Sequence, residues 1–210
     1  MTLVIGIDTS NYCSRSCAAI GEQNRVHALH KKMQAALKTA GYSGEMHWRR
    51  IRKNARNRAK RPLSQAIKES GMTFVVFDHP RPRDWRKEDF FARELPNAYA
   101  RELEPYLREA AIRGEKIWID CDKDFAAVLI GGTNKFLAKL LKNLGNRLAG
   151  VDVSPSHETD LTVRIGMARG RNVQIIGREA DGRQPAICIA DVVLGLTAEA
   201  SLDRVVKKRV

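Results

Sequence analysis

Long apolar runs are missing from this sequence. Hydrophobic residues make up 43% of its 210 positions, yet no segment approaches the ~20 apolar residues of a membrane-spanning helix. The N-terminus also lacks the basic segment and apolar block of a secretory signal, since its first charged side chain is Asp8. We therefore expect a soluble, cytoplasmic protein without a membrane partner.

Cysteine is scarce and widely spaced. The four cysteines are Cys13, Cys17, Cys121 and Cys188, which is not the pattern of a disulfide framework. The first two stand four positions apart, but no second Cys or His pair follows at the spacing of a zinc site. Small core residues are the main interpretation, and a zinc site is the alternative.

A phosphate-binding loop of the Gly-x-x-x-x-Gly-Lys-Ser/Thr type is absent as well. Gly131-Gly132-Thr133 precedes an expected helix and is a candidate anion cradle. The same residues are more common at a plain helix start. A small-molecule phosphohydrolase or nucleotide-binding protein is therefore the weakest of the functions considered.

Positive charge is what the chain has in excess. Its 37 Lys and Arg residues outnumber its 24 Asp and Glu residues, which gives a net charge of +13. Such a charge favours a polyanionic partner, RNA or DNA, over an anionic membrane. A generally basic protein with no such partner is the alternative.

The cations concentrate in the thirteen residues 49–61, which hold eight of them. Apolar residues recur every fourth position from Ile51 to Ile67, so a helix can bury them and project the cations outward. Pro62 favours a break or kink in that helix. Four cations share one face and are predicted to contact a nucleic-acid backbone, unless the face is merely solvated: Arg49, Lys53, Arg56 and Lys60.

Apolar runs and helical periodicities alternate along the chain, which predicts a single α/β domain over residues 1–210 with a helical insertion at roughly 87–113. Strands are expected at 3–8, 16–20, 73–78, 116–120, 150–153, 161–165 and 172–176, the first two as an antiparallel pair. Helices are expected at 27–39, through the basic segment, at 87–113 with interruptions near Pro96 and Pro105, at 133–144 and at 187–196. The apolar face of the first helix is assigned to Ala28, Met33, Ala36, Leu37 and Ala40.

Four carboxylates stand where a carboxylate is costly or specifically favoured. Asp8 and Asp120 each end an apolar strand, and Asp191 interrupts a helix that is otherwise apolar almost all round. Glu45 is expected in the first turn of the basic helix, where the helix dipole favours a negative charge. Each acid alone can be a cap, a turn former or an ion-pair partner.

Together these acids suit a metal site. Mg²⁺ and Mn²⁺ prefer hard oxygen ligands, and a pair of such ions can activate water and stabilise the leaving oxygen in phosphodiester cleavage. We predict Asp8, Glu45, Asp120 and Asp191 as metal ligands and catalytic residues. Asp78 and Asp122 are the alternatives, because strand ends are uncertain by a few residues. His47 is a candidate for proton transfer, or a packed histidine.

Three short motifs carry a resemblance to a known family. They are Ile7-Asp8-Thr9-Ser10-Asn11, Glu45-Met46-His47 and the segment 187–195, which ends in Ala-Asp-x-x-x-Gly. Their order resembles the ribonuclease H-like superfamily, and more closely the family called domain of unknown function 3800. That family has an I-D-E-S-G-like opening, an E-x-H motif and an L-Q-x-A-D-x-x-x-G-like closing helix.

The resemblance implies a mixed central sheet flanked by helices and a nuclease that uses Mg²⁺ or Mn²⁺. It implies that Asp8 and Asp120 bridge or flank the metals, that Glu45 completes the coordination, and that Asp191 binds the second metal or orients the water. The chain departs from the family at Thr9, Asn11 and Cys188, which replace Glu, Gly and Gln. Because Thr9 removes one ligand, the alternative is a non-catalytic nucleic-acid-binding protein on the same scaffold.

Overall fold

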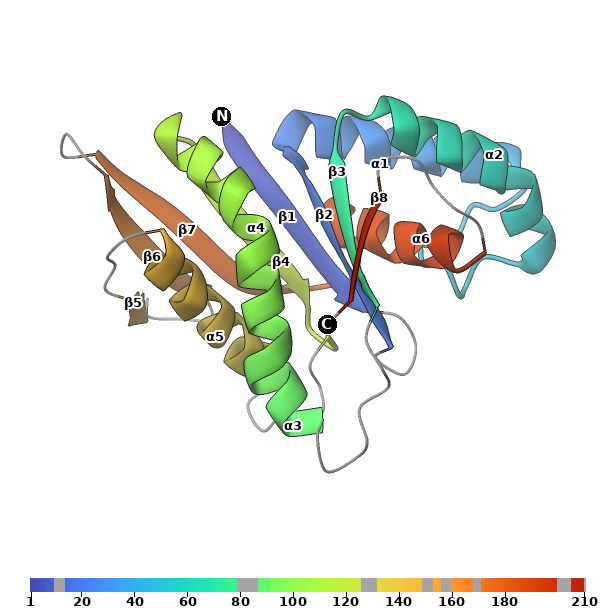
Figure 1. Cartoon of the computed structure of the whole chain (residues 1–210). Coiled ribbons are helices and arrows are strands. Elements are labelled where there is room, and N and C mark those ends of the chain that lie inside the picture. The colour runs from blue at the N-terminus through green and yellow to red at the C-terminus, as the bar shows by residue number, and fades with distance from the viewer. Residues whose placement is uncertain are drawn as a thin grey trace.

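The computed structural model describes residues 1–9, 14–78, 87–125, 132–148, 153–155, 160–167, 171–199 and 205–209. Its strands form a mixed sheet with helices on both faces (Figure 1), which confirms the expected α/β class and flanked mixed sheet. The strands are β1 (Thr2–Thr9), β2 (Arg15–Glu22), β3 (Thr73–Asp78), β4 (Lys116–Asp122), β5 (Val153–Pro155), β6 (Asp160–Met167), β7 (Arg171–Ala180) and β8 (Val205–Arg209). Their order across the sheet is β5-β6-β7-β4-β1-β2-β3-β8.

The central strands run mostly in one direction. β1 pairs antiparallel with β2, as expected, and parallel with β4. β2 pairs antiparallel with β3, and β4 pairs parallel with β7. Thus β3, β1, β4 and β7 are parallel to one another, so their C-terminal ends meet at one edge of the sheet.

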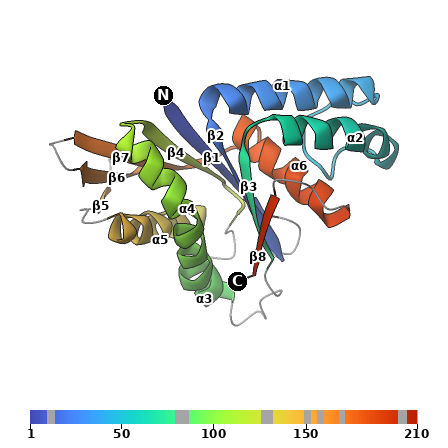
Figure 2. The ribbon, with the colours of Figure 1, turned by 45° about the horizontal axis from the view of Figure 1, so that its top comes forward.

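The helices divide between the two faces (Figure 2). One face carries α4 (Leu95–Ile112) and α5 (Gly132–Arg147), preceded by the short α3 (Lys87–Asp89) and the π-helical turn η3 (Phe90–Glu94). The other carries α6 (Pro185–Glu199), which is covered by α1 (Gln23–Thr39) and α2 (Lys53–Glu69). No helix within the described ranges has both the length and the apolar character needed to cross a membrane.

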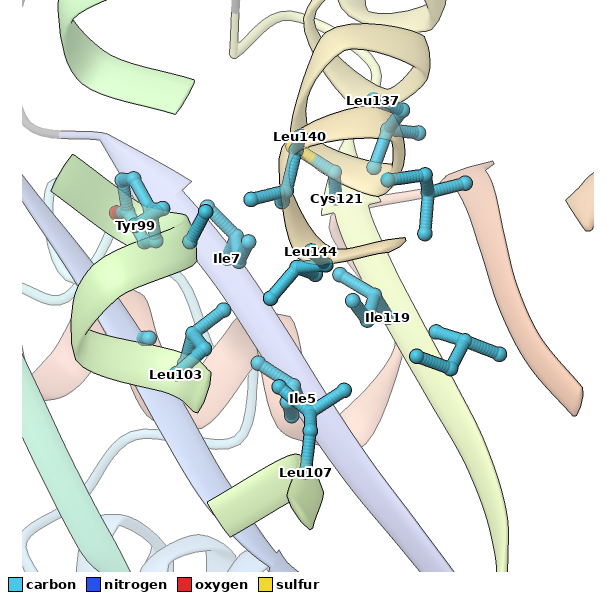
Figure 3. Packing of buried hydrophobic residues seen from close by; sticks show 14 of the residues in the cluster. Ile5, Ile7, Tyr99, Leu103, Leu107, Ile119, Cys121, Leu137, Leu140 and Leu144 are labelled. Atoms are coloured by element: carbon cyan, nitrogen blue, oxygen red, sulfur yellow. The ribbon is translucent and has the colours of Figure 1, made fainter. Parts of the chain in front are cut away.

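Alternation along the strands creates two cores. Ile5, Ile7, Ile119 and Cys121 point toward α4 and α5, where they pack on leucines and aromatic rings of those helices (Figure 3). The intervening residues of β1 and β4 face α6. The side chains labelled in Figure 3 are Ile5, Ile7, Tyr99, Leu103, Leu107, Ile119, Cys121, Leu137, Leu140 and Leu144.

Glycine lets the second core close. A Cβ on Gly6 would lie 2.3 Å from the carbonyl carbon of Ala186, so the backbones of β1 and α6 touch at this point. Cys17 on β2 and Cys188 on α6 are buried in the same core, and Cys121 is buried in the other. All three are free thiols, which confirms them as small core residues; Cys13 lies outside the described residues.

Several expected helices differ from the structure. α1 begins at Gln23 and buries Val26 and Leu29, whereas Ala28 is exposed. α2 continues through Pro62, contrary to the expected break. Because Pro62 is exposed, the carbonyl that loses its helical hydrogen bond can be solvated instead.

Further differences concern Glu45, an unexpected strand and the helical region that ends in α4. Residues 45–47 lie outside any helix, because α2 starts only at Lys53, so Glu45 is not in a first helical turn. β8 was not anticipated, although its Val205 packs against the second core. The helical region 87–112 changes to a π turn just before Pro96 and continues unbroken through Pro105.

Candidate active site

Two aspartates meet where β1 and β4 end side by side. The register pairs Gly6 with Asp120 and Ile7 with Cys121. Continuing it by one residue places Asp8 beside Asp122. Since Ile7 and Cys121 face α4 and α5, Asp8 and Asp122 point to the opposite face, under α6.

Asp191 of α6 joins them from above. It lies between the point where α6 touches Gly6 and the helix C-terminus, and its side chain is 16% exposed. Asp8, Asp122 and Asp191 all line one cavity of about 650 Å³, together with Asp124. The ends of two strands and one helix thus bring four acids to a single cavity.

The loop between α1 and α2 closes another wall. The backbone N–H of Trp48 donates to Oδ2 of Asp191 at 2.5 Å, and Nδ1 of His47 lies 3.1 Å from the same oxygen. Trp48 can approach this closely because residue 195 is glycine: a Cβ there would lie 2.2 Å from the indole ring. Gly195 therefore gives room for the loop that orients the Asp191 carboxylate.

The carboxylates repel one another. Burial raises the pKa of Asp8 well above its ordinary value, and the charges of Asp191 and Asp122 add to this effect. The backbone N–H of Thr9, 2.7 Å from Oδ1 of Asp8, and the charge of Arg49 offset only part of it. Burial and the charge of Asp124 likewise raise the pKa of Asp122. Burial and mutual repulsion therefore both disfavour the charged forms of Asp8 and Asp122.

Cations line the remaining walls. Arg15 comes from the start of β2, Arg49 from the loop and Arg56 from the first turns of α2. The guanidinium of Arg56 lies 5.5 Å from the centre of the Trp48 ring. Residues 23–69 hold thirteen Lys and Arg but only two acids, a net charge of +11 out of the +13 of the chain. The excess charge thus lies on the α1–α2 side, next to the cavity.

The structure places only some of the predicted site residues at the cavity. Asp8 and Asp191 line the cavity. Asp120 is buried further back on β4 in an ion pair with Arg178, whose Nη2 lies 3.2 Å from Oδ2. The reason is that β4 extends to Asp122, two residues beyond the expected strand end.

Glu45 is also engaged elsewhere. Its carboxylate pairs with Arg50 and with Arg183, whose Nε lies 3.1 Å from Oε1. It does not line the cavity. Of the four cations predicted on one face, Arg49 and Arg56 line the cavity, whereas Lys53 and Lys60 on α2 do not. Lys53 is exposed and Lys60 half-buried.

Several site residues were not identified from the sequence. Asp122 was only an alternative, and Arg15, Asp124 and Trp48 were not considered for the cavity. The signal for Asp122 was present, since it follows Asp120 at the two-residue spacing of one strand face. Asp78, the other alternative, pairs with Arg15 at 2.6 Å.

The pKa values of His47 and His30 provide a direct check of this geometry. We expect the pKa of His47 to lie above the ordinary histidine value because Asp191 stabilises its charged form. The pKa of His30 should lie below it, because burial and the charge of His27 disfavour protonation. NMR titration of the imidazole Cε1 protons measures both, with a His47→Gln variant to assign the resonance.

Asp191→Asn should lower the pKa of His47 and leave that of His30 unchanged. A His47 pKa that stays high in Asp191→Asn would contradict this geometry.

Over the residues that the structure describes, no three His, Cys, Asp or Glu side chains converge closely enough to form a ready metal cage. Oδ2 of Asp191 is engaged by the contacts with His47 and Trp48. Comparisons with protein-family models, with characterised proteins and with solved structures found no match.

Proposed function

We propose that this protein is a divalent-metal-dependent nuclease that cleaves phosphodiester bonds in RNA or DNA. The observation that carries the proposal is the cavity in which Asp8, Asp122 and Asp191 meet beside Arg49 and Arg56. The carboxylates supply hard oxygen ligands, and the guanidinium groups can bind a phosphate backbone. Asp122 takes the place that Asp120 had in the prediction.

The acids fit Mg²⁺ or Mn²⁺ in their chemistry. All are oxygen donors. Burial, followed by the charges of Asp191 and Asp122, raises the pKa of Asp8, and a bound cation would stabilise its carboxylate form. The Oδ1 atom of Asp8 accepts from Thr9, which leaves its Oδ2 for a ligand. Metal binding requires the carboxylates to draw closer than they stand, so Asp191 would turn from its contacts with His47 and Trp48.

The residues around the cavity can be assigned roles in phosphodiester cleavage. Arg49 and Arg56 would hold the phosphate against the acids, and Arg56 lies over the Trp48 ring. A metal bound at the acids would polarise the phosphate and lower the pKa of a water. His47 is half-exposed and lines the cavity, so its protonated imidazole can donate a proton to the leaving oxygen.

The ribonuclease H-like fold belongs to the same proposal. In its support, β2 is the one antiparallel strand among the five central strands β3-β2-β1-β4-β7. Acids also stand at the ends of two adjacent parallel strands and on the last helix. Asp8 and Asp191, the acids of the first and last motifs, line the cavity, whereas Glu45 of the middle motif does not.

A second candidate is a non-catalytic nucleic-acid-binding protein on the same scaffold. The lack of a ready metal cage among the described side chains favours it, as does Thr9 in place of an acid. It shares the cavity arginines and α2 with the first candidate. The two differ only in whether the bound strand is cut.

A cleavage assay separates the two candidate functions, and substitutions of Asp122 and Asp120 on β4 test which aspartate acts in it. Fluorescently labelled RNA and DNA are incubated with Mn²⁺ or Mg²⁺, and the products are resolved on gels. Asp122→Asn should reduce cleavage by roughly 100-fold or more, because it removes a ligand. Asp120→Asn should keep the activity of the folded protein but lower its stability by about 1–3 kcal/mol, because Arg178 loses a buried partner.

Equal loss of activity in both variants would show that Asp122 has no special role. Binding without cleavage by the wild-type protein in either metal would leave only the second candidate.

A further inference from the structure

Arg15 is held rigidly at the cavity wall. Its Nε donates to Oδ1 of Asp78 at 2.6 Å, and its Nη2 donates to Oγ1 of Thr197 at 3.1 Å. The first partner is the last residue of β3, and the second lies in the last turns of α6. The side chain is 18% exposed. Two elements therefore fix the guanidinium at one position and orientation.

The anchors leave part of Arg15 available. Its Nη1 has no hydrogen-bond partner among the residues that the structure describes. The residue lines the same cavity as Asp8 and Thr9, and the Thr9 hydroxyl donates to its carbonyl oxygen at 3.0 Å. A guanidinium that is already ordered loses little entropy when it binds an oxyanion.

Arg15 lies on the opposite side of Asp8 from Asp122 and is held well beyond Asp191 along α6. Its partner Thr197 lies six residues beyond Asp191 on α6, which is about 9 Å along a helix axis. On the sheet, β2 lies on the side of β1 away from β4, so Asp8 separates Arg15 from Asp122. The cavity thus has acids at one end and a fixed cation at the other.

We propose that Arg15 binds a second phosphate of the substrate strand, next to the phosphate held at Asp8, Asp122 and Asp191. This inference rests on the proposed function and narrows the substrate to a polynucleotide with successive phosphates, rather than a mononucleotide. The strand would enter past Arg49 and Arg56, cross the acids and reach Arg15. Asp78 and Thr197 are positioning residues for that contact.

Binding without metal tests the inference separately from cleavage. The probe is a fluorescein-labelled single strand of about 12 nucleotides, as RNA and as DNA, a length within the range of single-strand sites. Its affinity is measured by anisotropy in EDTA over a series of salt concentrations. Arg15→Gln should weaken binding about tenfold and reduce the slope of log K against log salt by about 0.7.

Two further variants exclude a purely structural effect. Arg15→Lys should restore the slope of log K against log salt but only part of the affinity. Lysine keeps the positive charge but lacks the planar set of N–H donors of a guanidinium. Arg25→Gln removes the same charge from an exposed site at the start of α1, where the side chain contacts the Gly71 carbonyl. It should bind with nearly wild-type affinity.

The outcomes are distinct. If Arg15→Gln binds the strand as well as Arg25→Gln does, the second phosphate site is wrong and the proposed function stands. If Arg15→Lys loses as much affinity and as much salt slope as Arg15→Gln, the residue acts only through the fold. If the wild-type protein binds neither RNA nor DNA, both the inference and the proposed function fail.

Discussion

Asp8→Asn is expected to abolish metal-dependent cleavage and, at the same time, to stabilise the metal-free protein. The carboxylate of Asp8 is buried and faces Asp191 and Asp122. An asparagine removes that repulsion and keeps an oxygen for the Thr9 N–H. Each kcal/mol gained should raise Tm by about 2–4 °C for a chain of this size.

The gain in stability of Asp8→Asn over the wild-type protein should depend on pH. The pKa of Asp8 is raised in the folded state, so between the ordinary aspartate value and the raised value the folded state binds more protons than the unfolded one. Wild-type stability in EDTA should therefore fall as pH rises through this window. Asp8→Asn should lack this part of the decline, and its advantage should be largest above the raised pKa.

Thermal unfolding in EDTA from acid to neutral pH measures this effect, and Mn²⁺ provides the complementary arm. A bound cation should raise the Tm of the wild-type protein by mass action and leave that of Asp8→Asn almost unchanged. A metal-free Asp8→Asn protein that is less stable than wild type at neutral pH would refute the claim that the buried Asp8 carboxylate destabilises the fold. Equal Mn²⁺ stabilisation of both proteins would refute the assignment of Asp8 as a ligand.

Gly6→Ala should be the most damaging small substitution for the fold. The new Cβ would lie 2.3 Å from the carbonyl carbon and 2.4 Å from the carbonyl oxygen of Ala186. Both are backbone atoms, so no side-chain rotation relieves the overlap and α6 must move off β1. We expect a loss of about 3 kcal/mol or more, or a Tm lower by roughly 6–12 °C.

Gly182→Ala is the matched control. Its Cβ would have Oδ1 of Asp122 at 3.6 Å as its nearest neighbour, an ordinary contact, so its stability should stay within about 0.5 kcal/mol of wild type. Denaturant unfolding of the three proteins gives the comparison. A Gly6→Ala protein as stable as Gly182→Ala would show that β1 and α6 do not touch at this position.

Gly6→Ala should also have a lower affinity for Mn²⁺ than Gly182→Ala and the wild-type protein. Because Gly6 sets where α6 lies on β1, displacement of the helix moves Asp191 relative to Asp8. Gly6→Ala should therefore weaken Mn²⁺ binding even in the fraction that folds, whereas Gly182→Ala should not. Isothermal titration calorimetry with Mn²⁺ measures the difference.

Local patterns were sufficient for most elements. β3 spans the residues expected for it, and β1 and β4 cover their expected ranges with small extensions, because a run of β-branched and aromatic residues has few alternatives to a buried strand. The apolar positions Ile51, Ala55, Ala59, Leu63 and Ile67 are buried as their spacing predicts. Asp8 and Asp191 were predicted from the cost of placing a carboxylate in apolar surroundings, and both line the cavity.

The sequence by itself therefore determined which residues form most of the strands, β8 excepted, which carboxylates are costly and where the positive charge concentrates. Only the tertiary structure decided which acids meet. Asp120 and Asp122 share one face of β4, so periodicity cannot distinguish them. The choice depends on the register with β1, more than 100 residues away in the chain, and on Arg178 of β7 pairing with Asp120. No short turn joins these parallel strands to fix their register, so it depends on how whole elements pack to bury one face of each strand.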